Sequence, residues 1–294
     1  MLMLDFTLDY KFIVMNNSDR AIVMFAIGEK YLKSFNETFR PSIERYARKI
    51  NTETIVVEEL IRPSSKKIYW QRLVMFSHPV ISKYDKVLMV DSDIYITKHA
   101  RNIFDVVGER PWGICKNNAY DLPTLALTDI SCYEDCPKKN RPSFLTNSGM
   151  YVISKSYQNN LEKIYAENQI REARGYDMGP ISYFLLNDKN GVILSSEFNT
   201  IVVSYIEKYG CALSSILKMY DSASFIHFAA NKWHSIFIFV RWFDTTEFYL
   251  SKRLVRFLGR RQFDFITAPA FKIFQHLVGI YNYRFRKFFS KSSV

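Results

Sequence analysis

The stretch K-V-L-M-V-D-S-D-I-Y-I-T (residues 86–97) places two aspartates, Asp91 and Asp93, at the end of an apolar run. The run at 87–90 predicts a buried strand, because continuous apolar stretches of this length suit a sheet covered on both faces. Side chains alternate along a strand, so both carboxylates are expected on the same side. Two neighbouring buried negative charges repel. Either a cation lies between them or one carboxylate is protonated.

Apolar runs alternate with longer amphipathic segments over the first 230 residues, which is typical of an α/β layered fold. We expect strands at 21–27, 54–57, 87–90, 112–115, 150–153 and 225–228. Helical patterns run from the end of the first strand to about residue 50, over 66–82, and from residue 180 onward. The polar segment 117–141 is typical of a loop.

A divalent cation accounts best for the paired aspartates. Mg²⁺ and Mn²⁺ prefer carboxylate oxygens, and such an ion can neutralise charge on a leaving diphosphate. An Asp-x-Asp pair by itself is more often a structural feature of a surface turn. Its position after four apolar residues favours a functional role.

Four segments, taken together, carry a family resemblance. Y-W-Q-R-L-V-M-F (69–76) followed by Y-D-K-V-L-M-V-D-S-D (84–93), T-N-S-G-M-Y-V-I (146–153), Y-D-M-G-P (176–180) and F-I-H-F-A-A-N-K-W (225–233) occur in this order. The chain thereby resembles the family-eight glycosyltransferases, which include the glycogenins and bacterial lipooligosaccharide galactosyltransferases, over about residues 21–233. The resemblance implies a GT-A type nucleotide-diphospho-sugar transferase fold, with a mixed central sheet flanked by helices.

The resemblance implies a metal site and part of a donor site. Asp91 and Asp93 would bind Mn²⁺ or Mg²⁺, Ser92 would lie near the donor ribose, and His227 would be the third metal ligand, since imidazole suits Mn²⁺ beside carboxylates. For His227 the alternative is an ordinary hydrogen-bonded histidine in an apolar strand. Lys232 would contact the diphosphate as a point charge, and its alternative is a surface lysine.

By the resemblance, four further residues stand at or next to family positions near the nucleotide or the sugar, with Tyr31 one residue later than the family pattern. Arg72 could reach the nucleotide or be a solvated helix residue, and Tyr31 could stack on uracil or pack in the core. Asn147 would lie near the transferred sugar or form a turn. Asp177 would lie by the anomeric carbon or bind donor hydroxyls, and it could also cap the next helix.

The chain departs from the family pattern at two further places. The segment H-F-A-A-N-K-W (227–233) is one residue shorter than usual and lacks the family's Gly and Pro, and Met178 stands where the family has Gln after the aspartate. Both changes bear on the donor sugar and the mechanism, and both leave the three metal-ligand positions intact.

These observations predict a metal-dependent glycosyltransferase that moves a sugar from a nucleotide-diphosphate donor, UDP-linked by the resemblance, to an acceptor hydroxyl. The resemblance implies retention at the anomeric carbon. One alternative is an inverting transferase in which Asp177 acts as base. A second is a non-catalytic membrane- or glycan-binding module. A phosphatase that begins with Asp-x-Asp is disfavoured, because no threonine follows in 94–96.

The charge of the chain is concentrated in its last part. Residues 231–294 hold 12 Lys and Arg, three acids and 17 aromatic residues, against a net charge of +11 for the whole chain. We expect residues 1–230 to form the catalytic domain and 231–294 a basic, aromatic helical extension. Such a helix suits an anionic membrane surface and a lipid-linked or glycan acceptor, or it packs on the domain. No nucleic-acid motif accompanies the charge.

The first residues lack the pattern of a secretory signal, because Asp5 and Asp9 interrupt the opening apolar residues. We therefore expect a cytoplasmic protein that could attach peripherally to the cytosolic face of a membrane.

Overall fold

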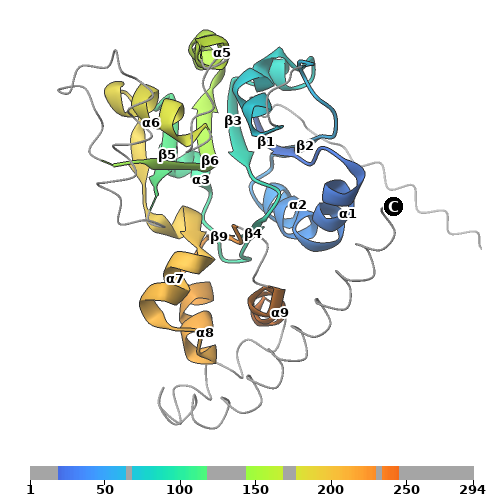
Figure 1. Ribbon diagram of the computed structural model, residues 1–294, viewed down its shortest axis with the longest axis vertical. Helices are drawn as coiled ribbons and strands as arrows, with labels where there is room; N and C mark the ends of the chain where they lie inside the picture. Colours follow the sequence, from blue (N-terminus) through green and yellow to red (C-terminus); the bar gives the residue numbers. More distant parts are fainter. Residues whose placement is uncertain (1–18, 64–67, 118–143, 168–176, 230–233, 245–294) are drawn as a thin grey trace, which may run out of the picture.

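A computed structural model describes residues 19–63, 68–117, 144–167, 177–229 and 234–244 (Figure 1). The strands are β1 (Arg20–Phe25), β2 (Glu53–Val57), β3 (Lys86–Val90), β4 (Ile94–Ile96), β5 (Trp112–Lys116), β6 (Thr146–Ser154), β7 (Val192–Leu194), β8 (Thr200–Ile201) and β9 (Phe225–His227). The α-helices are α1 (Glu29–Thr38), α2 (Arg40–Lys49), α3 (Ile103–Val107), α5 (Gln158–Glu167), α6 (Met178–Asn187), α7 (Val202–Tyr209), α8 (Leu213–Ser222) and α9 (His234–Phe243). Short 3₁₀ helices are η1 (Ile68–Ser77), η2 (Ile81–Lys83), η4 (Lys155–Tyr157) and η5 (Ser196–Asn199).

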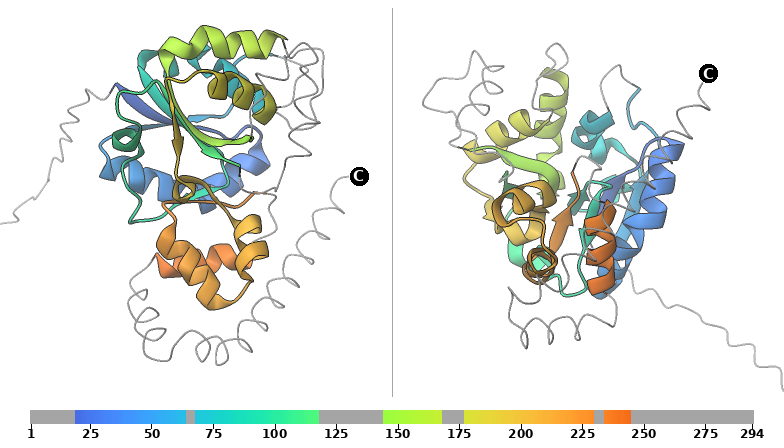
Figure 2. Two further views of the ribbon diagram at one scale, coloured as in Figure 1. Left: turned by 90° about the vertical axis from the view of Figure 1, so that its left-hand side faces the viewer. Right: turned by 60° about the horizontal axis from the view of Figure 1, so that its bottom comes forward.

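Six strands form the central sheet in the order β2-β1-β3-β6-β5-β7. β1 pairs in parallel with β2 and β3, whereas β6 runs antiparallel to both β3 and β5. β5 and β7 are parallel. The expected mixed sheet is confirmed, and helices cover both of its faces (Figure 2).

Successive side chains of the central strands point alternately into two apolar clusters. Ile22 and Leu88 face the cluster that α2, α3, α8 and α9 complete, whereas Val23 and Met89 face the cluster of η1, α5 and α6. All four side chains are fully or almost fully buried. Burial on both faces explains why these strands are continuous apolar runs in the sequence.

A second, three-stranded sheet in the order β4-β9-β8 lies beside the end of β3. β3 ends at Val90, and the chain resumes as β4 at Ile94, so the segment with both aspartates connects the two sheets. β4 pairs antiparallel with β9, and Ile94 lies opposite His227. This register brings a histidine more than 130 residues away next to the aspartates.

Helix α9 packs against the described core. Phe237 is buried and contacts the rings of Phe39, Tyr95 and Phe228. Just after the helix, Asp244 Oδ2 accepts a hydrogen bond from Tyr95 Oη at 2.7 Å. Residues 234–244 therefore belong to the same packed unit as the sheet. The rest of the predicted extension, with its basic aromatic stripe, lies outside the described residues.

Several local expectations differ from the structure. The helical pattern over 66–82 forms 3₁₀ helices at Ile68–Ser77 and Ile81–Lys83, with non-helical backbone at Val74. The strands β4, β7 and β8 have two or three residues each, too short to show a period of alternation. Most of the predicted loop 117–141 lies outside the described residues. Among the described helices, none combines the length and apolar character that crossing a bilayer requires.

Candidate metal and donor site

Asp91, Ser92 and Asp93 form a turn between β3 and β4. The two carboxylates lie on the same side, as predicted, but strand alternation is not the reason, because the strand ends before the first of them. Backbone hydrogen bonds fix the turn instead: Asp91 N–H donates to Gly149 O at 2.7 Å, and Phe228 N–H donates to Asp93 O at 2.9 Å. The turn is thus held by β6 on one side and by the end of β9 on the other.

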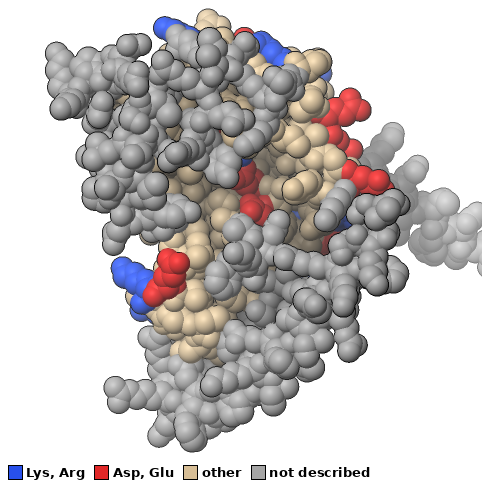
Figure 3. Space-filling model, in the orientation of Figure 1, with Lys and Arg blue, Asp and Glu red and all other residues tan. Residues whose placement is uncertain are grey.

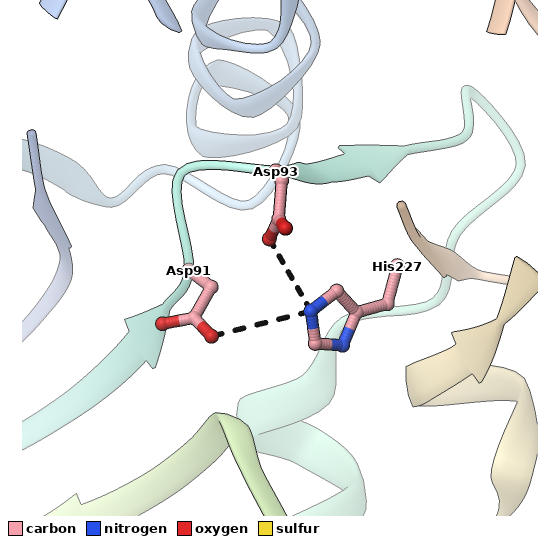
Figure 4. Close-up of side chains that lie close together, drawn as sticks. All are labelled: Asp91, Asp93 and His227. Carbon is pink, nitrogen blue, oxygen red and sulfur yellow. Dashed lines mark ion pairs between the residues drawn. The ribbon is translucent and has the colours of Figure 1, made fainter. Parts of the chain in front are cut away.

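Asp91, Asp93 and His227 converge and form the one group among the described residues whose ligand atoms suit a metal ion (Figure 4). Their ligand atoms lie within 4.8 Å of one another. His227 Nε2 lies 3.2 Å from Asp93 Oδ1 and 4.0 Å from Asp91 Oδ2. Acidic side chains are visible in a hollow near the centre of the face in Figure 3. The side chains of Asp91 and Asp93 are 29% and 26% exposed, so an ion could reach the group.

The donor set fits a hard divalent cation. Asp93 Oδ1 is buried and makes no well-aligned hydrogen bond, although His227 Nε2 lies 3.2 Å away, so a cation bound there would offset the cost of burying its charge. Two carboxylates and an imidazole are ligands that Mn²⁺ accepts. In the protein without metal, burial raises the pKa of Asp91 to about 6, with Arg72 acting against the rise. Burial opposes ionisation of Asp93 too, but His227 outweighs it and lowers the pKa.

Gly149 allows two of the three ligands, His227 and Asp91, to approach the backbone of β6. A Cβ atom at this position would lie 2.5 Å from His227 Cε1 and 2.9 Å from Asp91 Oδ2, closer than real Cβ contacts come. The glycine is thus required by space, which gives a physical reason for the small residue in the T-N-S-G segment.

Arg72 connects the metal group to Asp177. Its Nη2 lies 3.0 Å from Asp91 Oδ1, and its Nε lies 3.1 Å from Asp177 Oδ2. Arg72 Nη1 also donates to Ser148 O at 2.7 Å. The side chain is only 11% exposed, so the alternative of a solvated helix residue is wrong. Burial lowers the pKa of Arg72, but the two carboxylates outweigh it and keep the guanidinium charged.

Asp177 is buried at the start of α6. Its Oδ1 accepts a hydrogen bond from Ser148 Oγ at 2.9 Å. Asp177 occupies the N-cap position of α6, as the alternative reading expected, but its side chain makes no capping hydrogen bond to the helix. Burial raises the pKa of Asp177, while Arg72 and Ser148 act against the rise.

Asn147 and Asn199 continue the site behind His227. Asn147 Oδ1 accepts from Gly149 N–H at 2.9 Å and from Asn199 Nδ2 at 2.9 Å. Asn199 Oδ1 lies 3.0 Å from His227 Nδ1. Sequence reasoning missed Asn199 and Ser148. Asn199 stands between Phe198 and Thr200 outside any motif, whereas Ser148 lies in the T-N-S-G segment and could have been considered.

The remaining predicted donor residues are placed less centrally. Tyr31 lies on α1 and is 60% exposed, so the alternative of core packing is wrong and the ring is accessible. Ser92 is partly exposed in the turn between the two aspartates. Lys232 lies outside the described residues.

Comparison with known proteins supports the fold. Neither a protein-family model nor a curated protein sequence matches this chain. The structure is similar to the crystal structure of a glycosyltransferase involved in the glycosylation of the major capsid of PBCV-1, with a TM-score of 0.52 and 10% sequence identity. The match covers 76% of this chain and 98% of that chain. At such low identity the likeness concerns the fold alone: this chain has a mixed α/β fold that matches a GT-A glycosyltransferase, with an Asp-Asp-His group that could hold a metal ion.

Proposed function

We propose that this protein is a metal-dependent glycosyltransferase whose donor is a nucleotide-diphosphate sugar, most simply a UDP-sugar. The observation that carries the proposal is the convergence of Asp91, Asp93 and His227 at the end of β3 in a GT-A-like fold. Open α/β sheets bind ligands outside the carboxyl ends of their strands, which is where the two aspartates lie. The resemblance to the family-eight enzymes, carried by the four sequence segments, supports the same reading.

In this proposal each site residue has a role toward the metal ion or the donor. Asp91, Asp93 and His227 would hold Mn²⁺ or Mg²⁺, which when bound neutralises charge on the diphosphate leaving group. Ser92 would lie near the donor ribose, Tyr31 would stack on the base, and Lys232 would contact the diphosphate. Arg72 keeps Asp91 and Asp177 in place through its two ion pairs.

Asn147 would orient the transferred sugar, and Asp177 would shape the same side of the site through its contacts with Arg72 and Ser148. The proposal favours retention over inversion, because Asp177 is 2% exposed and its carboxylate is engaged by Ser148 and Arg72. A base toward an acceptor must reach the proton that it removes. NMR assignment of the product's anomeric configuration tests this: an inverted product would contradict the retaining mechanism.

The acceptor side of the proposal rests on sequence alone. A glycan or a lipid-linked hydroxyl would be the acceptor, and residues 245–294 would bring the enzyme to an anionic membrane surface. Co-sedimentation with anionic and neutral vesicles compares the full chain with a version that ends after Asp244, which keeps the packed helix α9. Equal binding of the two proteins would contradict this role of the tail.

A thermal-shift panel tests the donor site. Nucleotide diphosphates and nucleotide sugars are added with Mn²⁺ or with EDTA, and a ligand at 100 times its dissociation constant should add about 2.7 kcal/mol of stability. We expect a shift with UDP and Mn²⁺ that EDTA and Asp93→Ala abolish. Asp105→Ala is the matched control, because Asp105 is an exposed aspartate on α3 paired with Arg20, at the opposite end of the sheet strands.

The panel also separates the enzyme from a binding module. Binding of a UDP-sugar together with slow metal-dependent hydrolysis or transfer would support the enzyme. Binding without any turnover over a panel of acceptors would favour the non-catalytic module. A folded protein that binds no nucleotide with any metal ion would contradict the proposed function.

A further inference from the structure

We propose that Asn199 is a positioning residue that decides which nitrogen of His227 is available to the metal ion. The inference rests on the proposed metal site and deepens it. It concerns a chain of hydrogen bonds that starts at the backbone of Gly149, passes through Asn147 and Asn199, and ends at His227 Nδ1. All three side chains in this chain are at least 92% buried, so water does not compete freely for their polar atoms.

The direction of this chain of hydrogen bonds is set by a group that can only donate. Gly149 N–H points at the side chain of Asn147 with a separation of 2.9 Å. Because a backbone N–H cannot accept, the atom of Asn147 that it meets must be the amide oxygen. The oxygen and nitrogen of an asparagine amide are distinguished by such networks, and here the backbone fixes the assignment.

The same oxygen fixes the orientation of Asn199. The side-chain atom of Asn199 that approaches Asn147 Oδ1 at 2.9 Å must be the amide nitrogen, since two oxygens would repel. The other end of the Asn199 amide is then its oxygen, and this oxygen lies 3.0 Å from His227 Nδ1. An amide oxygen only accepts, so Nδ1 of His227 must carry a hydrogen.

A neutral imidazole with hydrogen on Nδ1 has its lone pair on Nε2. Nε2 is the nitrogen that faces Asp91 and Asp93 (Figure 4). The hydrogen-bond chain therefore presents the lone pair to the metal position and holds the ring plane. Groups behind a ligating histidine commonly set its tautomer in this way, and their loss typically reduces metal affinity about 10–100-fold.

The tautomer can be measured without any metal ion. We expect ¹⁵N-edited NMR of the metal-free protein, at a pH at which His227 is neutral, to show hydrogen on Nδ1 and none on Nε2. Comparison with His227→Gln identifies the signal. Hydrogen on Nε2 and none on Nδ1 in the wild-type protein would overturn the inference, whether or not the protein proves to be a transferase.

Metal affinity supplies an independent readout. Mn²⁺ binding is followed by electron paramagnetic resonance in the wild type, Asn199→Ala, Asn199→Asp and Thr97→Val. We expect Asn199→Ala to lose about 10–100-fold in affinity. Asn199→Asp keeps an acceptor for Nδ1 but turns a second oxygen toward Asn147 Oδ1, so it should keep the Nδ1 hydrogen and recover only part of the affinity. Thr97→Val is the control, because it removes a buried hydroxyl bonded to Ala223 O and Ser224 O near the same small sheet.

The outcomes are distinguishable from failure of the proposed function. If the wild type binds Mn²⁺ and Asn199→Ala binds it equally well while folded, Asn199 has no positioning role. Equal losses in Asn199→Ala and Thr97→Val would reduce the effect to general destabilisation and likewise overturn the inference. If the wild type binds no Mn²⁺, the proposed metal site fails, and the NMR measurement still decides the tautomer.

Discussion

Gly149→Ala should damage the metal site through a single added methyl group. The new Cβ would lie 2.5 Å from His227 Cε1, whereas ordinary contacts begin at 3.4 Å, so the ring must retreat by about 0.9 Å. Metal–ligand distances tolerate deviations of only about 0.2 Å. The Cβ would also press on Asp91 Oδ2 at 2.9 Å, so two of the three ligands must move.

Two magnitudes follow from this crowding. Overpacking a buried site typically costs about 1–3 kcal/mol of stability. Loss of ligand geometry should reduce Mn²⁺ affinity at least tenfold, which corresponds to about 1.4 kcal/mol of binding free energy. Urea unfolding measures the first quantity, and isothermal titration calorimetry with Mn²⁺ measures the second.

Gly113→Ala is the matched control. Gly113 lies in β5 of the same sheet, and a Cβ there would meet Val107 Cγ2 at 2.6 Å. The crowding is similar, but none of the nearest atoms belongs to a metal ligand. We expect comparable destabilisation without loss of Mn²⁺ affinity. Unchanged affinity in Gly149→Ala, or equal losses in the two variants, would refute the reasoning.

Two further predictions concern charged groups. Arg72→Met removes the cation between Asp91 and Asp177, and removing one partner of a buried ion pair costs about 3–5 kcal/mol of stability. Mn²⁺ should restore part of this stability, because it supplies positive charge at Asp91. Urea unfolding measures the effect, and equal stability of variant and wild type would contradict the account. Burial opposes ionisation of Glu162, but hydrogen bonds from neighbouring side chains, among them Arg62, outweigh it and lower the pKa. A lowered folded-state pKa gives stability that is complete above the ordinary pKa and is lost as the pH falls through the folded value. The stability advantage of wild type over Glu162→Gln should therefore shrink between pH 6 and 3, about the range in which carboxylates titrate; an advantage that does not change with pH would contradict the prediction.

The sequence predicts the sheet well where its strands are buried on both faces. The apolar runs at 87–90 and 150–153 are long enough to be recognised as strands, and both lie in the central sheet. The pattern at 66–82 predicts an ordinary helix, whereas Ile68–Ser77 forms a 3₁₀ helix, because its apolar residues fit either geometry and tertiary packing decides between them. The two- and three-residue strands of the small sheet depend on pairing with each other, which no local pattern records.

The metal group was predictable because its residue types are chemically restrictive. Asp91, Asp93 and His227 were selected from motif positions, and the structure brings them together. The residues that support the metal group were harder to predict from the sequence. Arg72 was expected to face the nucleotide, but its ion pairs cross from η1 to a turn and a helix start far along the chain. Asn199 matters only through its neighbours in space, so its sequence surroundings give no signal.

Direct measurement of Mn²⁺ binding to the wild type and to Asp93→Asn tests the central claim most closely. Asparagine keeps the shape of Asp93 and removes the charge of the buried oxygen that makes no well-aligned hydrogen bond. Calorimetry should show one Mn²⁺ per chain in the wild type, tighter binding in the presence of UDP, and a large loss of affinity in the variant. Binding of the same strength to both proteins, with both shown to be folded, would contradict the assignment of Asp91, Asp93 and His227 as a metal site.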